Sequence, residues 1–164
     1  MHVLVRGQKG YIGTIMVPML QAEGFTNLEK YFSFAEKVKE TKRNLLDFLI
    51  NLKRNKKSIV GYGAPGKGNT LLNYCGIRSD FLDYTVDRNP YKQGKFLPGT
   101  HIPIFHPDKI KETRPNYVLI LPWNIKEEIM NQLSYISSWD GRFIVPIPKV
   151  SLYHASEIEI DTAI

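Results

Sequence analysis

Hydrophobic residues recur along this chain with two different periods. From Thr26 to about Asn55, apolar side chains return every three or four residues, which predicts one long amphipathic helix. Thr26 and Glu29 have the spacing of a capping box at its start. From Ser58 onward, short β-branched runs alternate with helical stretches. This alternation predicts an α/β fold, an open parallel sheet with helices on both faces.

The second half of the chain supplies the expected strands and helices. Strands are predicted at residues 58–62, 84–86, 102–104, 117–121 and 142–147. The run at 117–121 is wholly apolar, which is typical of a central strand covered on both faces. Helices are predicted after the first strand through Tyr74, at 107–112 and at 125–138. Residues 151–164 carry little pattern and predict a peripheral tail.

Residues 1–24 predict a strand and a helix of their own. Between these lie three glycines at intervals of three: Gly7, Gly10 and Gly13. This opening resembles that of the extended short-chain dehydrogenases, which include NAD-dependent epimerases and dehydratases. The acidic second strand of that family is absent, and its Tyr-x-x-x-Lys spacing occurs only in a Pro/Gly-rich loop, at Tyr91 and Lys95. We expect an epimerase-like fragment that does not hold NAD by itself.

Composition narrows the class of protein. The 164 residues, 43% of them hydrophobic, suit one folded domain with an appendage. The single cysteine, Cys75, excludes a disulfide framework and a multi-cysteine zinc site, and no metal is expected. No apolar run is long enough to span a bilayer, and the start of the chain is too short in apolar residues for a signal peptide. We expect a cytoplasmic protein without a membrane partner.

The formal net charge is +6, and the densest basic cluster is Lys53, Arg54, Lys56 and Lys57. This cluster is either a nucleic-acid contact or a solvated helix end, where cations complement the helix dipole. We favour the helix end and expect no nucleic-acid partner, because no accompanying aromatic or arginine pattern is typical of RNA-binding modules. A basic domain also suits a small anion such as a nucleotide.

A glycine-rich loop follows the first strand of the alternating region. Four glycines fall within eight residues: Gly61, Gly63, Gly66 and Gly68. With Lys67 and Asn69 at the start of the next helix, they can present backbone N–H groups to a phosphate, or they only make a tight turn. The ATP-binding P-loop is excluded, because Gly68 stands where Ser or Thr should hold Mg²⁺. The spacing Gly61-x-Gly63-x-x-Gly66 matches the dinucleotide fingerprint instead.

Other candidate site residues follow from the expected sheet, because ligands of such sheets bind beyond the carboxyl ends of the strands. The loops expected to converge there are residues 61–69, 87–93, 122–124 and those before Ile102. Asp87 either accepts hydrogen bonds from ribose hydroxyls or is a turn residue. Lys67, Arg88 and Lys92 either offset phosphate charge or are solvated.

The remaining candidates also have two interpretations each. Asn69 and Thr70 either cap the helix or donate to phosphate, with capping preferred. Trp123 either stacks on a base or packs in the core, and Asn124 is a candidate cap of the next helix. His101 is the histidine expected near the same edge, and a lone histidine there is more often structural than catalytic. No catalytic residue is assigned, because the sequence offers neither a Ser/His/Asp set nor a clear acid/base carboxylate pair.

Five segments together resemble one known family. They read GYGAPGKGNTLLNY (61–74), DYTVDRNPYKQG (83–94), LPGTHIP (97–103), LPWN (121–124) and GRFIVPIP (141–148). This set resembles the Rossmann-like C-terminal domain of the SAM-dependent C-methyltransferases, whose known members methylate deoxysugar carbons on nucleotide-linked sugars. The resemblance runs from about Leu28 to Val150. One departure is Gly66, where that family usually has Ala.

The resemblance implies a division of labour. Complete members have a zinc-binding first domain, a SAM-binding catalytic second domain, and this third domain, which helps hold the nucleotide-sugar. Nothing before Leu28 resembles the first two. We therefore expect SAM and the catalytic base to belong to a partner, either a methyltransferase core subunit or another copy in a homodimer. The expected organisation is a fragment at 1–24, a helix and linker at 25–57, the domain at 58–150 and a tail at 151–164.

The leading hypothesis from the sequence is a nucleotide-sugar-binding domain that is not catalytic alone. An NAD-linked oxidoreductase or epimerase-like domain is the alternative suggested by the two glycine patterns and Asp87. A third hypothesis is a non-catalytic docking module, in which the long helix contacts a methyltransferase core.

Overall fold

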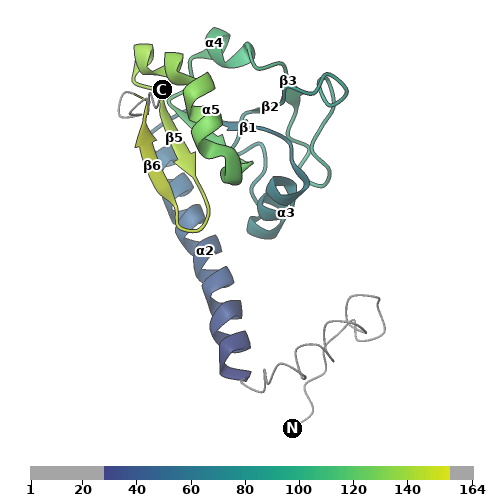
Figure 1. Ribbon diagram of the computed structural model, residues 1–164, viewed down its shortest axis with the longest axis vertical. Helices are drawn as coiled ribbons and strands as arrows, with labels where there is room; N and C mark the ends of the chain where they lie inside the picture. Colours follow the sequence, from purple (N-terminus) through teal and green to yellow (C-terminus); the bar gives the residue numbers. More distant parts are fainter. Residues whose placement is uncertain (1–27, 156–164) are drawn as a thin grey trace, which may run out of the picture. The chain divides into compact units, whose positions relative to one another are not determined.

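The computed structural model describes residues 28–155, and their side chains from Phe34 onward (Figure 1). The chain divides into two units, Met1–Val38 and Lys39–Ile164. The described part of the first unit is the beginning of helix α2 (Leu28–Arg54). The strand and helix predicted within residues 1–24 lie outside the described residues, as does the end of the predicted tail.

The prediction of one long helix ending near Asn55 is confirmed by α2, which has 27 residues. Lys53 and Arg54 lie in its last turn, where cations complement the helix dipole. In the second unit, Leu45 and Leu49 are fully buried. Their spacing of four places them on one face of the helix, so this part of α2 covers the sheet with an apolar stripe.

Six strands form one sheet in the order β3-β2-β1-β4-β5-β6. The first five in chain order are parallel, and β6 pairs antiparallel with β5. This is the Rossmann strand order, and the direction of winding reverses between β1 and β4. The strand bounds are β1 (Ile59–Tyr62), β2 (Thr85–Val86), β3 (Ile104–Phe105), β4 (Tyr117–Ile120), β5 (Arg142–Val145) and β6 (Ser151–His154).

Hydrophobic cores cover both faces of this sheet, as predicted. The side chains of β4 alternate, with Val118 in one core and Leu119 in the other. The remaining helices are α3 (Gly66–Cys75), α4 (Lys109–Thr113), α5 (Lys126–Gln132) and the 3-10 helices η1 (Trp123–Ile125) and η2 (Ser134–Trp139). The Leu119 core includes Leu72 of α3 and the buried leucines of α2, and the Val118 core includes Ile129 of α5.

The prediction that the chain from residue 151 is only a peripheral tail is wrong for Ser151–His154. These residues form β6, with Tyr153 opposite Phe143 in β5 (Figure 1). The pattern is hard to find in the sequence because the strand is short and prolines at 146 and 148 separate it from β5. Two antiparallel neighbouring strands need only a short turn between them, so no helical segment precedes β6 to indicate that a further strand follows.

The helix predicted at 125–138 is broken into three pieces, η1, α5 and η2. Leu133 ends α5 with φ −102° and ψ 15°. Beyond it, the hydroxyls of Ser137 and Ser138 donate to the carbonyls of Ser134 and Tyr135, each three residues earlier. Local hydrogen bonds of serine hydroxyls compete with the α-helical bonds of the backbone. The apolar residues therefore continue at helical spacing, but the backbone forms the tighter 3-10 helix η2.

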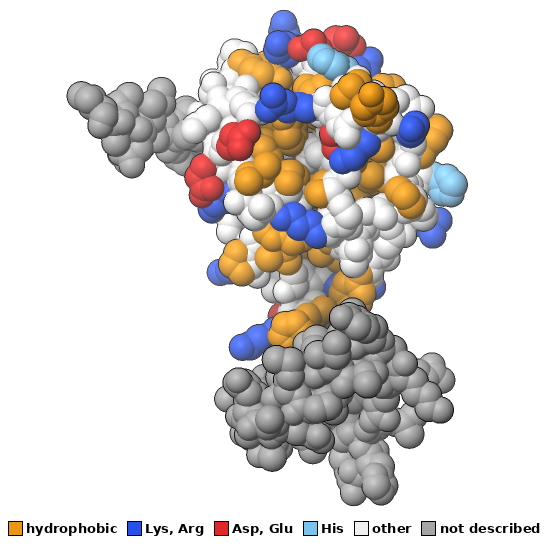
Figure 2. Space-filling model, turned by 45° about the vertical axis from the view of Figure 1, so that its right-hand side comes forward, with side chains coloured by type: hydrophobic (Ala, Val, Ile, Leu, Met, Phe, Trp, Pro, Cys, Tyr) orange, Lys and Arg blue, Asp and Glu red, His pale blue; other side chains and the backbone are white. Residues whose placement is uncertain are grey.

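Within residues 28–155, no helix is long and apolar enough to cross a membrane. On the face shown in Figure 2, Lys and Arg side chains are scattered among hydrophobic ones.

Substitution by alanine is expected to have opposite effects on stability at two glycines of α3. A Cβ at Gly68 would lie 2.7 Å from Leu121 Cβ, whereas a Cβ at Gly66 would meet nothing within 4 Å. We expect Gly68→Ala to lower the free energy of unfolding by about 1–3 kcal/mol through overpacking. Gly66→Ala is expected to leave it unchanged or raise it by up to about 1 kcal/mol, because alanine favours helix. Urea denaturation of the two variants checks this, and equal effects would contradict it.

Candidate functional site

The glycine loop is fixed between two strands where the winding of the sheet reverses. Gly63 follows β1 with φ +86°, and a Cβ there would lie 2.7 Å from Cδ of Pro122, which follows β4. Gly63 N–H donates to Val86 O over 2.6 Å, and Thr85 Oγ1 donates to Gly63 O over 2.9 Å. Only glycine fits this backbone conformation and this space without strain. The loop therefore lies at the switch point of the sheet, where such folds bind ligands.

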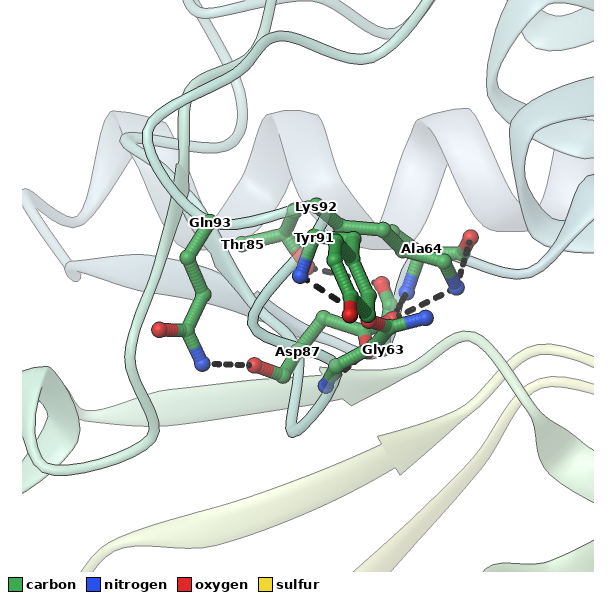
Figure 3. Close-up of polar contacts among 8 residues, drawn as sticks. Gly63, Ala64, Thr85, Asp87, Tyr91, Lys92 and Gln93 are labelled. Atoms are coloured by element: carbon green, nitrogen blue, oxygen red, sulfur yellow. Dashed lines mark hydrogen bonds and ion pairs between the residues drawn. The ribbon is translucent and has the colours of Figure 1, made fainter.

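Asp87 ties the loop after β2 to the glycine loop (Figure 3). Its Oδ2 accepts from Ala64 N–H over 2.8 Å and from Lys92 Nζ over 3.0 Å, and its Oδ1 accepts from Asn89 N–H over 2.8 Å. Lys92 Nζ also donates to Ala64 O over 3.0 Å, and Gln93 Nε2 donates to Asp87 O over 2.9 Å. The Asp87 side chain is only 13% exposed. Much of its acceptor capacity is thus used within the protein.

Burial by itself would raise the pKa of Asp87. The hydrogen bonds from Asn89, Lys92 and Ala64, with the charge of Lys92, outweigh that effect and hold the pKa below its usual value. The carboxylate is therefore ionised at neutral pH, and Lys92 is its counter-ion. Lys92 is consequently less available to an incoming phosphate than the sequence suggests.

Lys67 bridges the start of α3 to η1. Its Nζ donates to Asn124 Oδ1 and lies 4.8 Å from the centroid of the Trp123 ring. Trp123 is partly buried against the core. Lys67 and Trp123 thus join the two loops that flank the switch point.

The capping roles predicted for Asn69, Thr70 and Asn124 are wrong. The N-cap position of α3 is Pro65, without a side-chain cap, and Thr70 Oγ1 instead donates to Gly66 O. Asn69 Oδ1 is buried without a partner among the described residues. Asn124 Oδ1 accepts from Lys67, and α5 has no side-chain cap. Since no side chain caps α3, the N–H groups of its first turn remain suited to an acceptor from outside the helix.

A pocket of about 190 Å³ opens at this edge of the sheet, and we name it the switch-point pocket. Its wall combines the glycine loop at Gly63–Pro65 with Pro122 after β4 and one face of α5. Four of the predicted site residues line it: Gly63, Asp87, Arg88 and Lys92. The structure therefore brings together the loops after β1, β2 and β4, as predicted.

The loop before Ile102 does not join them, which corrects the sequence-based expectation for His101. His101 is exposed, has φ +57° and does not line the switch-point pocket. Its turn is bound elsewhere, because Asn73 Nδ2, near the end of α3, donates to Pro98 O over 3.0 Å. Gly61 is also a packing residue, since a Cβ there would lie 2.7 Å from Thr85 Oγ1.

Three polar residues that the sequence did not identify also line the pocket: Tyr62, Glu128 and Gln132. Tyr62 OH donates to Gln132 Oε1 over 3.2 Å, and Gln132 Nε2 donates to Glu128 Oε1 over 2.9 Å. Glu128 Oε1 lies 4.0 Å from Arg88 Nη1. The spacing of four between Glu128 and Gln132 was a usable signal, because it places both on one face of a helix.

The arrangement is suited to binding. It offers an exposed arginine and apolar walls around a concave site, whereas the N–H groups of Gly63 and Ala64 are already bound to Val86 O and Asp87 Oδ2. Among the described residues, no group of three or more His, Cys, Asp or Glu side chains is placed to hold a metal ion.

The strand order and the loop at its switch point define a Rossmann-like domain. The family model described as the C-methyltransferase C-terminal domain matches residues 16–148 of this chain, and the chain belongs to that family. The match begins within the segment that the sequence assigned to an epimerase-like fragment, earlier than the expected start near Leu28.

Two further comparisons give the scale of the similarity. The chain is 34% identical over 129 residues to the C-methyltransferase NovU of Streptomyces niveus, and this covers 79% of the chain and 31% of NovU. It thus spans less than a third of that relative's length. UDP-D-quinovosamine 4-dehydrogenase from Vibrio fischeri aligns with a TM-score of 0.43 at 21% identity, over 60% of this chain and 92% of that one. So distant a likeness says nothing of function.

The Asp87 contacts predict a pH-dependent effect of Asp87→Asn. A carboxylate whose folded-state pKa is lowered stabilises the fold above its unfolded pKa of about 3.9, and this contribution is lost as the pH falls through the folded value. We expect Asp87→Asn to lower the free energy of unfolding by about 1–3 kcal/mol at pH 7. The difference should shrink below about pH 4. Denaturation at both pH values checks this, and a pH-independent difference would contradict it.

Proposed function

We propose that this domain binds a nucleotide-linked sugar and holds it for a methyltransferase core. The observation that carries the proposal is the switch-point pocket, which combines the glycine loop with the loops after β2 and β4. Membership of the C-methyltransferase C-terminal domain family supports it, because methyl transfer to a sugar requires the sugar to be held beside the methyl donor.

In this proposal, a phosphate of the ligand lies against residues 66–68, the first turn of α3, whose N–H groups have no side-chain cap. Arg88 supplies charge, because its side chain is 69% exposed and its nearest carboxylate is 4.0 Å away. Asp87 acts by holding the loops in register, through its bonds to Ala64, Asn89 and Lys92. Lys67, Trp123 and Asn124 contact one another but do not line the switch-point pocket, so no contact with the ligand is assigned to them.

The methyl-transfer chemistry belongs to the core in this proposal. SAM would bind there, and the catalytic base would lie there, either on a separate core subunit or on another copy in a homodimer. The C-methyltransferase NovU, of which this chain matches 31%, is long enough to include such a core. The core and this domain would meet in the cytoplasm.

An NAD-linked function is the second candidate, because the strand order and the Gly61-x-Gly63-x-x-Gly66 spacing are those of dinucleotide-binding folds. In those folds a carboxylate after the second strand receives the ribose hydroxyls. Here Asp87 already accepts hydrogen bonds from Ala64, Asn89 and Lys92, so it is poorly prepared for that role. This favours the nucleotide-sugar.

Calorimetry of the whole chain with thymidine diphosphate glucose tests the proposal. We expect binding below millimolar ligand, and Arg88→Gln should weaken it about tenfold, as expected for losing one charged contact. Arg78→Gln is the matched control, because Arg78 is an exposed arginine that does not line the switch-point pocket. No binding at millimolar ligand, or equal losses in both variants, would reject the proposal for this chain. Enhanced NADH fluorescence without sugar-nucleotide binding would favour the second candidate.

A further inference from the structure

A pocket of about 270 Å³ lies at the end of the sheet opposite to the switch-point pocket, and we name it the amino-end pocket. Three parallel strands, β1, β4 and β5, begin beside one another there. The lining residues stand at or just before the starts of these strands: Lys57, Asn116, Tyr117, Asp140 and Arg142. The amino-end pocket is therefore separate from the candidate ligand site.

The backbone on both sides of β1 fixes the rim of this pocket. Lys56 has φ +56° and its N–H donates to Lys53 O over 2.9 Å, while Lys57 N–H donates to Leu52 O over 3.0 Å. These two bonds end α2 as a Schellman motif, which sets the position of Lys57. Next to it, Asn116 Oδ1 accepts from Ser58 N–H over 3.0 Å and from Ser58 Oγ over 3.1 Å.

The pocket has more hydrogen-bond donors and positive charge than its own acceptor can use. Lys57 is exposed, and within residues 34–155 its ammonium forms no hydrogen bond or ion pair. Because Asn116 Oδ1 is held by Ser58, the Nδ2 hydrogens of Asn116 are the ones left to donate. Arg142 adds a second cation, and Asp140 is the one carboxylate in the lining. One positive charge thus remains unbalanced.

Arg142 is not used up by Asp140. Arg142 Nη2 donates to Asp140 Oδ2 over 3.3 Å, and the Asp140 side chain is 78% exposed. A guanidinium has five N–H donors, so most of them remain after this one long bond. By contrast, Lys92 gives two bonds of 3.0 Å, one of them to the well-buried Asp87. Arg142 can therefore bind a second carboxylate while it keeps Asp140.

Strand β6 carries the chain to this same end of the sheet (Figure 1). It runs antiparallel to β5, and His154, its last residue, lies opposite Arg142, the first residue of β5. The Cα atoms of such a pair are about 5 Å apart. Whatever follows β6 therefore starts beside the amino-end pocket.

The sequence that follows β6 is acidic. Residues 156–164 contain no Lys or Arg, and their carboxylates stand at alternate positions: Glu157, Glu159 and Asp161. Alternate residues of an extended chain lie on one face. Covalent geometry keeps the Cα of Glu157 within about 11 Å of that of His154, so its side chain can reach the pocket beside Arg142.

We propose that the amino-end pocket binds the acidic segment 157–161 of the same chain, with a carboxylate held between Lys57 and Arg142. Charge complementarity and the position where β6 ends select this occupant. The bound segment covers the amino ends of the strands and leaves the switch-point pocket open, because the two pockets lie at opposite ends of the sheet.

Paramagnetic broadening in NMR spectra of the whole chain tests this. A nitroxide is attached at Thr162→Cys, because Cys75 is buried. We expect the label to broaden the amide resonances of Lys57 and Asn116. About 0.5 M sodium chloride should reduce the broadening, since salt screens exposed charges.

Substitutions in the labelled chain separate a bound segment from one that merely lies near the end of β6. Combining Glu157→Gln, Glu159→Gln and Asp161→Asn should reduce the broadening about threefold, and Lys57→Gln about twofold. Lys95→Gln is the matched control, because Lys95 is an exposed lysine that does not line the pocket. It should leave the broadening unchanged. The chemical shifts of each variant report whether it is folded.

Two results would overturn the inference. Broadening that is the same with and without the three carboxylates would mean that the amino-end pocket does not bind the segment. Broadening of an isotope-labelled chain by the nitroxide of another copy would assign the pocket to the acidic segment of a second copy. Either result leaves the proposed function untouched, because the three substitutions should not change the binding of thymidine diphosphate glucose.

Discussion

The bonds of Asp87 hold the candidate site together. Two short parallel strands, β1 and β2, end beside each other, and Gly63 in the first loop bonds to Val86 and Thr85 of β2. One carboxylate links the two loops, because it accepts from the backbone of Ala64 and of Asn89 and pairs with Lys92, which returns to the carbonyl of Ala64. The glycine loop is therefore preorganised by a charged group from the next strand, and a ligand need not order it.

Most of the fold could be predicted from the sequence, because the spacing of hydrophobic residues indicates which side chains are buried. The run at 117–121 predicts a central strand, and β4 lies at the centre of the sheet with a core on each face. The hydrophobic pattern does not predict the secondary structure where the same side chains are buried by a different backbone conformation. Residues 134–139 keep an apolar period in a 3-10 helix, and β6 is a short edge strand without a preceding helix.

The site was predictable only as far as topology determines it. Position after a strand was enough to place Gly63, Asp87 and Arg88 in one pocket. It could not show which side chains bind each other, so Lys67 and Lys92 were taken for candidate phosphate ligands although each is engaged within the protein. The prediction for His101 was wrong for another reason. Its turn is hydrogen-bonded to Asn73 near the end of α3, a contact that spacing in the sequence does not indicate.

The glycines of the loop, equal in the sequence, are unequal in the structure. At Gly63 and Gly68, neighbouring atoms leave no space for a Cβ, whereas a Cβ at Gly66 would meet no described atom within 4 Å. Alanine and glycine are therefore interchangeable to the fold at position 66, and a difference there between relatives carries no information about their backbone. A pattern built to recognise this domain gains its discrimination from positions 61, 63 and 68, where a side chain would displace Thr85, Pro122 or Leu121.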